Sequence, residues 1–155
     1  MVLTRILQPR CIKVPVLSRD KQSVITELVD LLNANKLLHD RDVALQSVLA
    51  REQTRSTGIG GRIAIPHGKS NAVNDLVVGM GIAHKPIEFD SIDGRPVTII
   101  ILLISALDKT GPHIQALATI SRLMLDEEFK QRLEMAGSPQ EAYKLLQEKE
   151  SQQNR

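Results

Sequence analysis

The sequence predicts a single α/β domain in which a buried sheet is flanked by helices. Segments with helical periodicity alternate with short strand-like segments along the chain. The run "PVTIIILLIS", residues 96–105, is apolar on both faces, as in a strand covered by helices on two sides. A chain of 155 residues with 42% hydrophobic content is long enough for one core. We expect residues 1–150 to form the domain and residues 151–155, "SQQNR", to be a polar tail that frays.

Two helices are predicted in the first third of the chain. Asp20 is a suitable N-cap for a helix from residue 21, and Asp40 for a second helix over residues 41–52. The apolar stripe of the first helix consists of Val24, Ile25, Leu28, Val29, Leu31 and Leu32. In the second helix, the residues expected to face inward are Val43, Ala44, Val48 and Leu49. Arg51 falls in the last turn of this helix, next to a glycine-rich segment.

Three strands and three further helices follow. The strands are expected at residues 62–67, 75–83 and 96–105, where β-branched and apolar residues dominate. The helices are expected at residues 113–125, 126–136 and 139–150, the last after a stop at Gly137 and a cap at Ser138.

Composition excludes several classes of partner. The 20 basic and 18 acidic residues are scattered, and one Tyr, two Phe and no Trp leave almost no stacking surface, so nucleic acid is not an expected ligand. The longest apolar run is shorter than the roughly 20 residues of a membrane-spanning helix, and no signal-peptide core is present near Met1. We therefore expect a cytoplasmic protein without membrane insertion. The single cysteine, Cys11, is expected to be a buried, inactive thiol.

The segment "STGIGGRIAIPHGKS", residues 56–70, contains four glycines and the first candidate reactive residue, His67. Pro66 restricts the backbone, so we expect the chain to leave the strand at His67 and Gly68 to form an anion-binding turn. Lys69 and Ser70 would add a charge and a hydroxyl suited to a phosphoryl group. In the alternative interpretation this is only a tight turn, and His67 satisfies a backbone carbonyl.

His113 is the second candidate, because Gly111 and Pro112 are expected to end a loop and His113 to begin a helix. A helix N-terminus favours negative charge and a neutral imidazole. His39 and His84 are expected to have solvent or structural roles. A metal site built from His67, His84 and His113 is a further interpretation, but the chain has no short HxH or CxxC spacing, so we expect neither metal nor cofactor.

Several of these motifs occur together in a known family. The segments "RE" at 51–52, "STGIG" at 56–60, "AIPHGK" at 64–69, "PIEFDSIDGRPV" at 86–97 and "HIQALATISRL" at 113–123 match it in order and spacing. Together they resemble the enzyme IIA domain of the bacterial sugar phosphotransferase system, of the mannitol and fructose type that includes a nitrogen-regulatory branch. The resemblance implies a mixed sheet flanked by helices.

The resemblance also implies a function and a set of site residues. The protein would be a phosphohistidine carrier that accepts a phosphoryl group from HPr on His67, and then passes it to a IIB domain or uses it as a regulatory switch. His113 would stabilise the phosphoryl oxygens and Arg51 would supply positive charge. The remaining candidates for a phosphate-binding loop are Ser56, Thr57, Gly58, Gly68, Lys69 and Ser70.

The alternative function is a regulatory interaction module whose output is phosphorylation-dependent binding of partner proteins. Two positions also depart from the family pattern, because Arg55 and Arg62 stand where glycine is usual. We expect the added charge of Arg62 to change how the phosphoryl donor docks.

Overall fold

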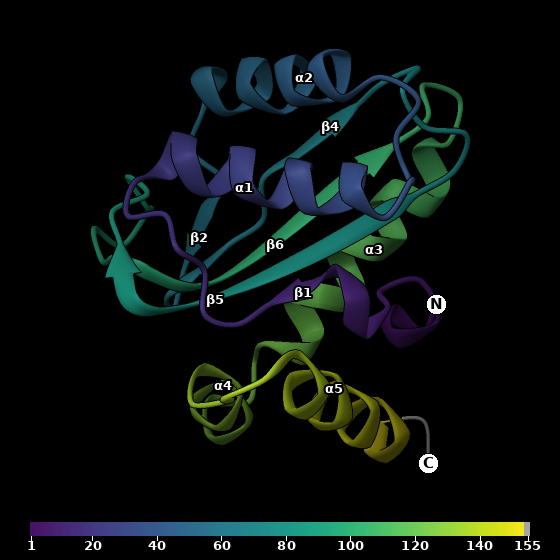
Figure 1. Ribbon diagram of the computed structural model, residues 1–155. Helices are drawn as coiled ribbons and strands as arrows, with labels where there is room; N and C mark the ends of the chain where they lie inside the picture. The colour runs from purple at the N-terminus through teal and green to yellow at the C-terminus, as the bar shows by residue number, and fades with distance from the viewer. Residues whose placement is uncertain (154–155) are drawn as a thin grey trace.

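The computed structural model describes residues 1–153. This part of the chain contains a six-stranded sheet and five helices, preceded by the short 3-10 turns Leu3–Arg5 and Pro9–Cys11 (Figure 1). The strands are β1 (Ile12–Lys13), β2 (Gly58–Gly60), β3 (Ile63–Ala64), β4 (His67–Lys69), β5 (Val77–Ile87) and β6 (Val97–Ser105). The helices are α1 (Lys21–Ala34), α2 (Arg41–Thr54), α3 (Thr110–Leu123), α4 (Glu127–Glu134) and α5 (Pro139–Gln153).

The sheet is mixed, as the resemblance implied. Its order is β1-β5-β6-β3-β2, with β4 pairing the later part of β6. Strands β5 and β6 are antiparallel, whereas β3 and β4 both run parallel to β6. The register places Ile63 opposite Ile99 and His67 opposite Leu103. His67 therefore lies towards the carboxyl end of the central strand, the end at which α/β folds collect ligands.

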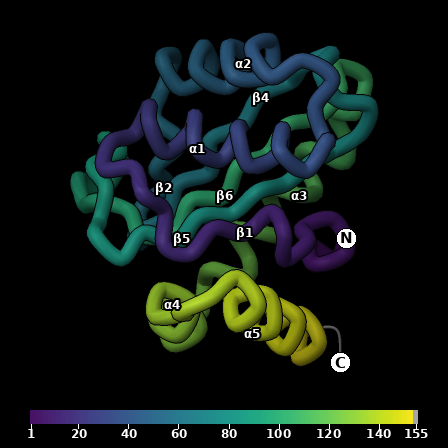
Figure 2. Tube along the Cα trace, viewed as in Figure 1, coloured from purple at the N-terminus to yellow at the C-terminus, as the bar shows by residue number. Residues whose placement is uncertain are grey.

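Helices cover both faces of this sheet. Helices α1 and α2 lie side by side over one face, and α3, α4 and α5 lie on the other side (Figures 1 and 2). Every residue of β6 is buried. This confirms the prediction, made from its continuous apolar run, that β6 is a strand covered on two sides.

Local capping signals predicted the first two helices well. The Asp20 carboxylate accepts a hydrogen bond from the Ser23 N–H at 2.9 Å, and Asp40 accepts one from the Val43 N–H at 3.2 Å. The inward orientation predicted for Val43 is wrong, because its side chain is 48% exposed and Leu45 is buried instead. Ala44 and Val48 are buried as predicted, Leu49 is partly buried, and the buried side of α2 also includes Glu52.

The strand predicted over residues 62–67 is interrupted. The segment His67–Lys69 is not the predicted turn; it forms a further strand, β4. Its neighbours extend the pairing with β6, since the Leu103 N–H donates to the Pro66 carbonyl at 3.0 Å and the Ser70 N–H to the Ser105 carbonyl at 2.9 Å. The chain therefore continues along the sheet past His67.

Other boundaries also differ from the prediction. Strand β5 continues past His84 to Ile87, and the His84 Nε2 lies 3.1 Å from the Ala136 carbonyl oxygen, a structural contact. Helix α3 begins at Thr110, so His113 is in its first turn and is not its first residue. Helix α5 includes residues 151–153 of the predicted tail, while residues 154–155 lie outside the described residues.

The two ends of the described chain are held together by Glu150. Its buried carboxylate accepts hydrogen bonds from the Leu3 N–H at 2.6 Å, the Thr4 N–H at 2.9 Å and the Thr4 hydroxyl at 2.8 Å. Cys11, which ends the second 3-10 turn, is buried and has a free thiol, as expected. Among residues 1–153, no helix is both long enough and apolar enough to cross a membrane.

Candidate active site

Two histidines from different elements meet beside the carboxyl end of β6. The ring centroids of His67 in β4 and His113 in α3 are 5.2 Å apart, and the ring planes make an angle of 65°. Both rings line a cavity of about 260 Å³ whose other lining residues are Ser47, Arg51, Gly68 and Lys69. The fold therefore brings together three elements, α2, β4 and α3, around one small cavity.

The backbone fixes the proton on the His67 ring. The His67 Nδ1 lies 2.7 Å from the Ile65 carbonyl oxygen. Because a carbonyl oxygen can only accept, Nδ1 carries the proton and the lone pair is on Nε2. Burial lowers the pKa of His67, and the charge of Arg51 lowers it further, against the opposing effects of the Ile65 hydrogen bond and Glu52. The ring is neutral at pH 7, with a nucleophilic Nε2.

His113 is held by a buried hydroxyl. Its Nδ1 lies 2.7 Å from the Ser105 Oγ, and its side chain is almost fully buried. Burial lowers the pKa of His113 to about 4, with smaller contributions from His67 and Lys69. His113 is therefore also neutral at pH 7.

Two cations border the neutral imidazoles. An Arg51 Nη1 donates to the Arg55 carbonyl at 2.8 Å, and the Lys69 Nζ donates to the Thr110 hydroxyl at 2.8 Å. These bonds hold both charges at the cavity, an arrangement suited to an anion such as a phosphoryl group. Within residues 1–153, no group of three or more His, Cys, Asp or Glu side chains is placed to bind a metal ion.

Gly68 contributes through packing. A Cβ at this position would lie 2.8 Å from the Ser47 Oγ and 3.1 Å from the Ser47 carbonyl carbon. The glycine therefore allows α2 to approach β4 closely, and this approach brings Arg51 to the cavity that His67 lines.

Four of the predicted phosphate-loop residues do not line the cavity. Ser56 donates to the Phe89 carbonyl and accepts from the Gly58 N–H at 3.0 Å. Thr57 donates both its N–H and its hydroxyl to the buried carboxylate of Glu52. The Ser70 Oγ accepts from the Ala72 N–H, at 3.0 Å. The fold already uses these polar groups in its own hydrogen bonds, and of the six loop candidates only Gly68 and Lys69 border the cavity.

Three hydroxyl groups at or next to the site were not predicted from the sequence. Ser47 lies one helical turn before Arg51, so helical periodicity could have placed it on the same face. Ser105 is the polar last residue of a strand in which the six preceding residues are all Ile or Leu, and this pattern could have marked it. Thr110 was assigned to a loop, because α3 was predicted to begin later.

Arg62 lies away from the histidines. Its carbonyl oxygen accepts from the Thr98 N–H at 2.9 Å, near the start of β6, whereas His67 pairs with Leu103 near the end of that strand. Its guanidinium pairs with Glu134 at 2.7 Å and Glu127 at 2.6 Å. The charge of Arg62 is thus balanced by α4, and Arg62 does not border the cavity.

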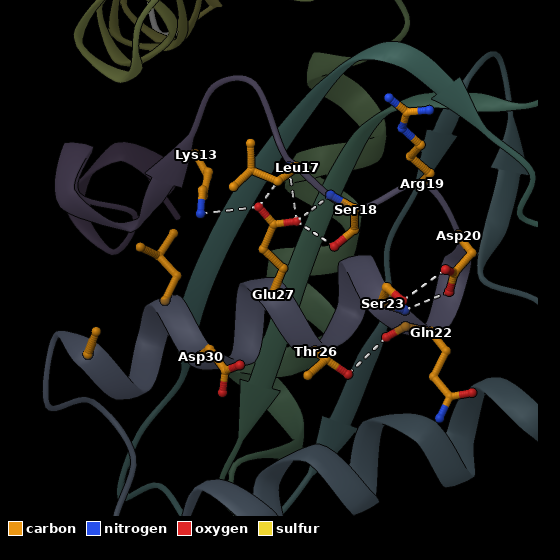
Figure 3. Close-up of a pocket in the computed structure, with 12 residues that line it drawn as sticks. Lys13, Leu17, Ser18, Arg19, Asp20, Gln22, Ser23, Thr26, Glu27 and Asp30 are labelled. Atoms are coloured by element: carbon orange, nitrogen blue, oxygen red, sulfur yellow. Dashed lines mark hydrogen bonds and ion pairs between the residues drawn. The ribbon is translucent and has the colours of Figure 1, made fainter.

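A larger cavity of about 870 Å³ lies beside α1 (Figure 3). Its central carboxylate, Glu27, accepts from the N–H groups of Leu17 and Ser18, each at 2.9 Å, and pairs with Lys13 at 3.2 Å. Within the described chain, no histidine or cysteine lines this cavity. The nucleophilic and proton-bearing groups are instead at the pair of histidines.

Proteins of known sequence are similar to this chain over most of its length. Residues 5–149 match the family model described as "Phosphoenolpyruvate-dependent sugar phosphotransferase system, EIIA 2". A nitrogen regulatory protein of Klebsiella oxytoca is 32% identical over 147 residues, which cover 94% of this chain and 90% of that protein. The fructose-specific EIIABC component of Bacillus subtilis is 33% identical over 89% of this chain, which spans only 22% of that longer protein.

Solved structures are similar over nearly the whole chain. The nitrogen regulatory protein IIA-Ntr from Neisseria meningitidis matches with a TM-score of 0.82 and 25% identity, covering 94% of this chain and 99% of the other. The mannitol IIA of Escherichia coli matches with a TM-score of 0.78 and 22% identity, covering 90% and 97%. The family model and the solved structures therefore agree. The chain belongs to the EIIA 2 family of the phosphoenolpyruvate-dependent sugar phosphotransferase system.

Proposed function

We propose that the protein is a phosphohistidine carrier in the cytoplasm and that His67 is its phosphorylated residue. The observation that carries this proposal is the hydrogen bond between the His67 Nδ1 and the Ile65 carbonyl, at 2.7 Å. This bond leaves Nε2 as the free nucleophilic nitrogen of a neutral ring that lines a cavity with two cations. An HPr-type phosphocarrier is the proposed donor.

In the transfer step, the His67 Nε2 forms a bond to phosphorus while the bond from phosphorus to the donor's ring nitrogen breaks. The electron pair of the broken bond stays on the donor's ring, and the His67 Nδ1 keeps its proton, which remains hydrogen-bonded to the Ile65 carbonyl oxygen. Negative charge spreads over three oxygens in the loose transition state. Arg51 and Lys69 supply positive charge there, and His113 supplies a neutral hydrogen-bond donor.

The test is phosphorylation with purified components. The protein is incubated with phosphoenolpyruvate, enzyme I and HPr, and is then analysed by mass spectrometry. We expect one added phosphate that is labile in acid and stable in base, and none in His67→Ala. Phosphorylation of His67→Ala to the wild-type extent would refute the assignment of His67.

The fate of the phosphoryl group has two candidate answers. A solved relative, the mannitol IIA of Escherichia coli, has been described in complex with phosphorylated enzyme IIB, which supports transfer to a IIB domain. The high coverage of nitrogen regulatory proteins favours a second candidate, an interaction module controlled by phosphorylation.

One comparison separates these two candidates. The phosphorylated protein is mixed with fructose- or mannitol-type IIB domains, and both phosphorylation states are used separately to capture partners. Loss of the phosphate to a IIB domain supports a transport role. A partner retained by one phosphorylation state alone, without loss of the phosphate, supports the regulatory role.

A further inference from the structure

Ser105 is a buried polar residue in direct contact with His113, the helical member of the histidine pair. It ends β6, its side chain is fully buried, and its Oγ lies 2.7 Å from the His113 Nδ1. Its backbone is fixed by the sheet, since it pairs with Lys69 and its carbonyl accepts from the Ser70 N–H at 2.9 Å. The hydroxyl is therefore held rigidly against the ring of His113.

The donor of this hydrogen bond can be assigned from the hydrogen bonds that the Ser105 hydroxyl makes. Within residues 1–153, the hydrogen bond that the Ser105 Oγ makes is the one to His113. If Nδ1 donated to Ser105, the buried hydroxyl proton would be left without an acceptor, which is costly. If Ser105 donates to the lone pair of Nδ1, both groups are satisfied and the ring proton is on Nε2.

The start of α3 has few backbone N–H groups free to bind an anion, so a proton on the His113 ring would add a needed donor. A helix N-terminus normally offers several free N–H groups to an anion. In α3, Pro112 has no N–H, and the N–H of the N-cap residue Lys109 is already donated to the Ala106 carbonyl at 3.0 Å. The first turn of α3 therefore has fewer donors than usual beside the cavity, and the His113 ring can replace one of them.

We propose that Ser105 is a positioning residue that orients His113 and holds it as the Nε2–H tautomer, so that a neutral N–H donor faces the phosphoryl group on His67. The effect of this tautomer on phosphoryl transfer rests on the proposed function. The two rings would then be in opposite tautomers, with a lone pair on the His67 Nε2 and a proton on the His113 Nε2. One ring attacks phosphorus, and the other binds the oxygens.

Nitrogen NMR tests the tautomer without any phosphoryl transfer. Uniformly ¹⁵N-labelled protein is examined at neutral pH, with ring signals assigned by comparison with His113→Ala. We expect a protonated Nε2 and an unprotonated, hydrogen-bonded Nδ1 for His113, and a shift of the Nδ1 signal in Ser105→Ala. A protonated Nδ1 in the wild type, or an unchanged Nδ1 signal in Ser105→Ala, would overturn the proposal even if His67 proves not to be phosphorylated.

A double-mutant cycle tests the effect on transfer. Loss of one net hydrogen bond predicts that Ser105→Ala slows phosphoryl transfer by about 2- to 10-fold. In the His113→Ala background, Ser105→Ala should cause no further loss, because its effect passes through His113. An equal loss in both backgrounds would mean a purely structural role and would contradict the proposal.

Thr98→Val is the matched control for both measurements. Thr98 is a buried residue on the same strand, and its hydroxyl donates to Glu134 at 2.7 Å, away from the histidines. The substitution removes a hydrogen-bonded hydroxyl of β6 while keeping the side-chain volume. We expect it to leave the His113 Nδ1 signal and the transfer rate unchanged. If it alters both as much as Ser105→Ala does, the effects report general disturbance of β6 and the proposal fails.

Discussion

The rings of His67 and His113 meet edge to face, with centroids 5.2 Å apart, although one is on a strand and the other on a helix. Their hydrogen-bond partners differ in kind: a backbone carbonyl for His67 and a serine hydroxyl for His113. A carbonyl can only accept, whereas a hydroxyl can also donate. Two identical side chains are thereby given different chemical tasks by their surroundings.

Substitution of His113 should slow phosphorylation without abolishing it. Removing one oxyanion-type donor commonly costs roughly 100- to 1000-fold in rate. Arg51 and Lys69 remain at the cavity in His113→Ala, so we expect a loss near the lower end of this range. Rapid-quench transfer from phosphorylated HPr measures the rate. His39→Ala, at an exposed position, should keep the wild-type rate; a wild-type rate in His113→Ala would remove His113 from the active site.

Protein stability should decrease as the pH falls through the range set by His113. Burial lowers the pKa of His113 to about 4 in the folded protein, below the ordinary value of 6.5. The unfolded chain therefore takes up its proton first, and the free energy of unfolding falls as the pH drops from 6.5 towards 4. A loss of roughly 1–3 kcal/mol is expected.

Urea unfolding of the wild type and His113→Gln across this pH range measures the effect. The carboxylates titrate in both proteins, so the informative quantity is the difference between their pH profiles. The variant should lose less stability than the wild type on acidification. Parallel profiles would show that the His113 pKa is similar in the folded and unfolded states.

Gly68→Ala should destabilise the protein and weaken the active site together. The added methyl group would overlap Ser47 of α2 and force the helix away from β4. Such overpacking costs about 1–3 kcal/mol, and the shift would carry Arg51 away from the cavity. Thermal unfolding and the phosphoryl-transfer rate test the two effects.

Gly137→Ala is the matched stability control. A Cβ at Gly137 would have only a Glu141 carboxylate oxygen within 4 Å, at an ordinary contact distance of 3.7 Å. We expect no loss of stability in this variant. If Gly68→Ala were equally well tolerated, the close approach of α2 to β4 would not depend on glycine.

Arg62 should matter for stability and not for donor docking. Its guanidinium binds Glu134 and Glu127, and its hydrogen bond lowers the pKa of Glu127 to about 2. Arg62 has a backbone φ of 70°, which is strained for any residue with a Cβ. Arg62→Gly removes the ion pairs but relieves this strain, whereas Arg62→Ala removes the ion pairs and keeps the strain. We expect Arg62→Ala to be less stable than Arg62→Gly by about 1 kcal/mol.

The rate of transfer from HPr, and its dependence on salt, should be the same in both Arg62 variants as in the wild type. This outcome differs from the expectation based on sequence, in which Arg62 alters docking of the donor. The expectation counted the charge of Arg62 as an added one, whereas in the fold Glu127 and Glu134 balance it. A salt dependence that changes in Arg62→Gly would restore that expectation.

Features encoded locally were predictable from the sequence. Asp20 and Asp40 cap their helices through residues three positions later, so short-range patterns suffice. The buried strand β6 is equally evident, because every one of its positions is apolar or small. Motif resemblance placed His67 and His113 in one site, and the fold brings them together.

Features that depend on distant partners were not predictable. Strand β4 has only three residues and exists because β6 offers a free edge beside Pro66. Ser56 and Thr57 look like phosphate ligands in the sequence, but Phe89 and Glu52 already occupy their hydrogen-bonding groups. Polar residues in a glycine-rich segment do not reveal which of them the fold itself uses.

The contact of Glu150 with Leu3 and Thr4 also bears on the order in which the molecule assembles. Glu150 is 147 positions from Leu3 and 146 positions from Thr4 in the sequence. The N–H groups of Leu3 and Thr4 therefore have no carboxylate partner until residue 150 has emerged from the ribosome. The sheet between β5 and β6 and its covering helices can form earlier, from nearer segments. During synthesis, α5 can therefore dock against the first residues only after the strands of the sheet have been made, and in a chain halted before residue 150 the Leu3 and Thr4 N–H groups would lack their carboxylate partner.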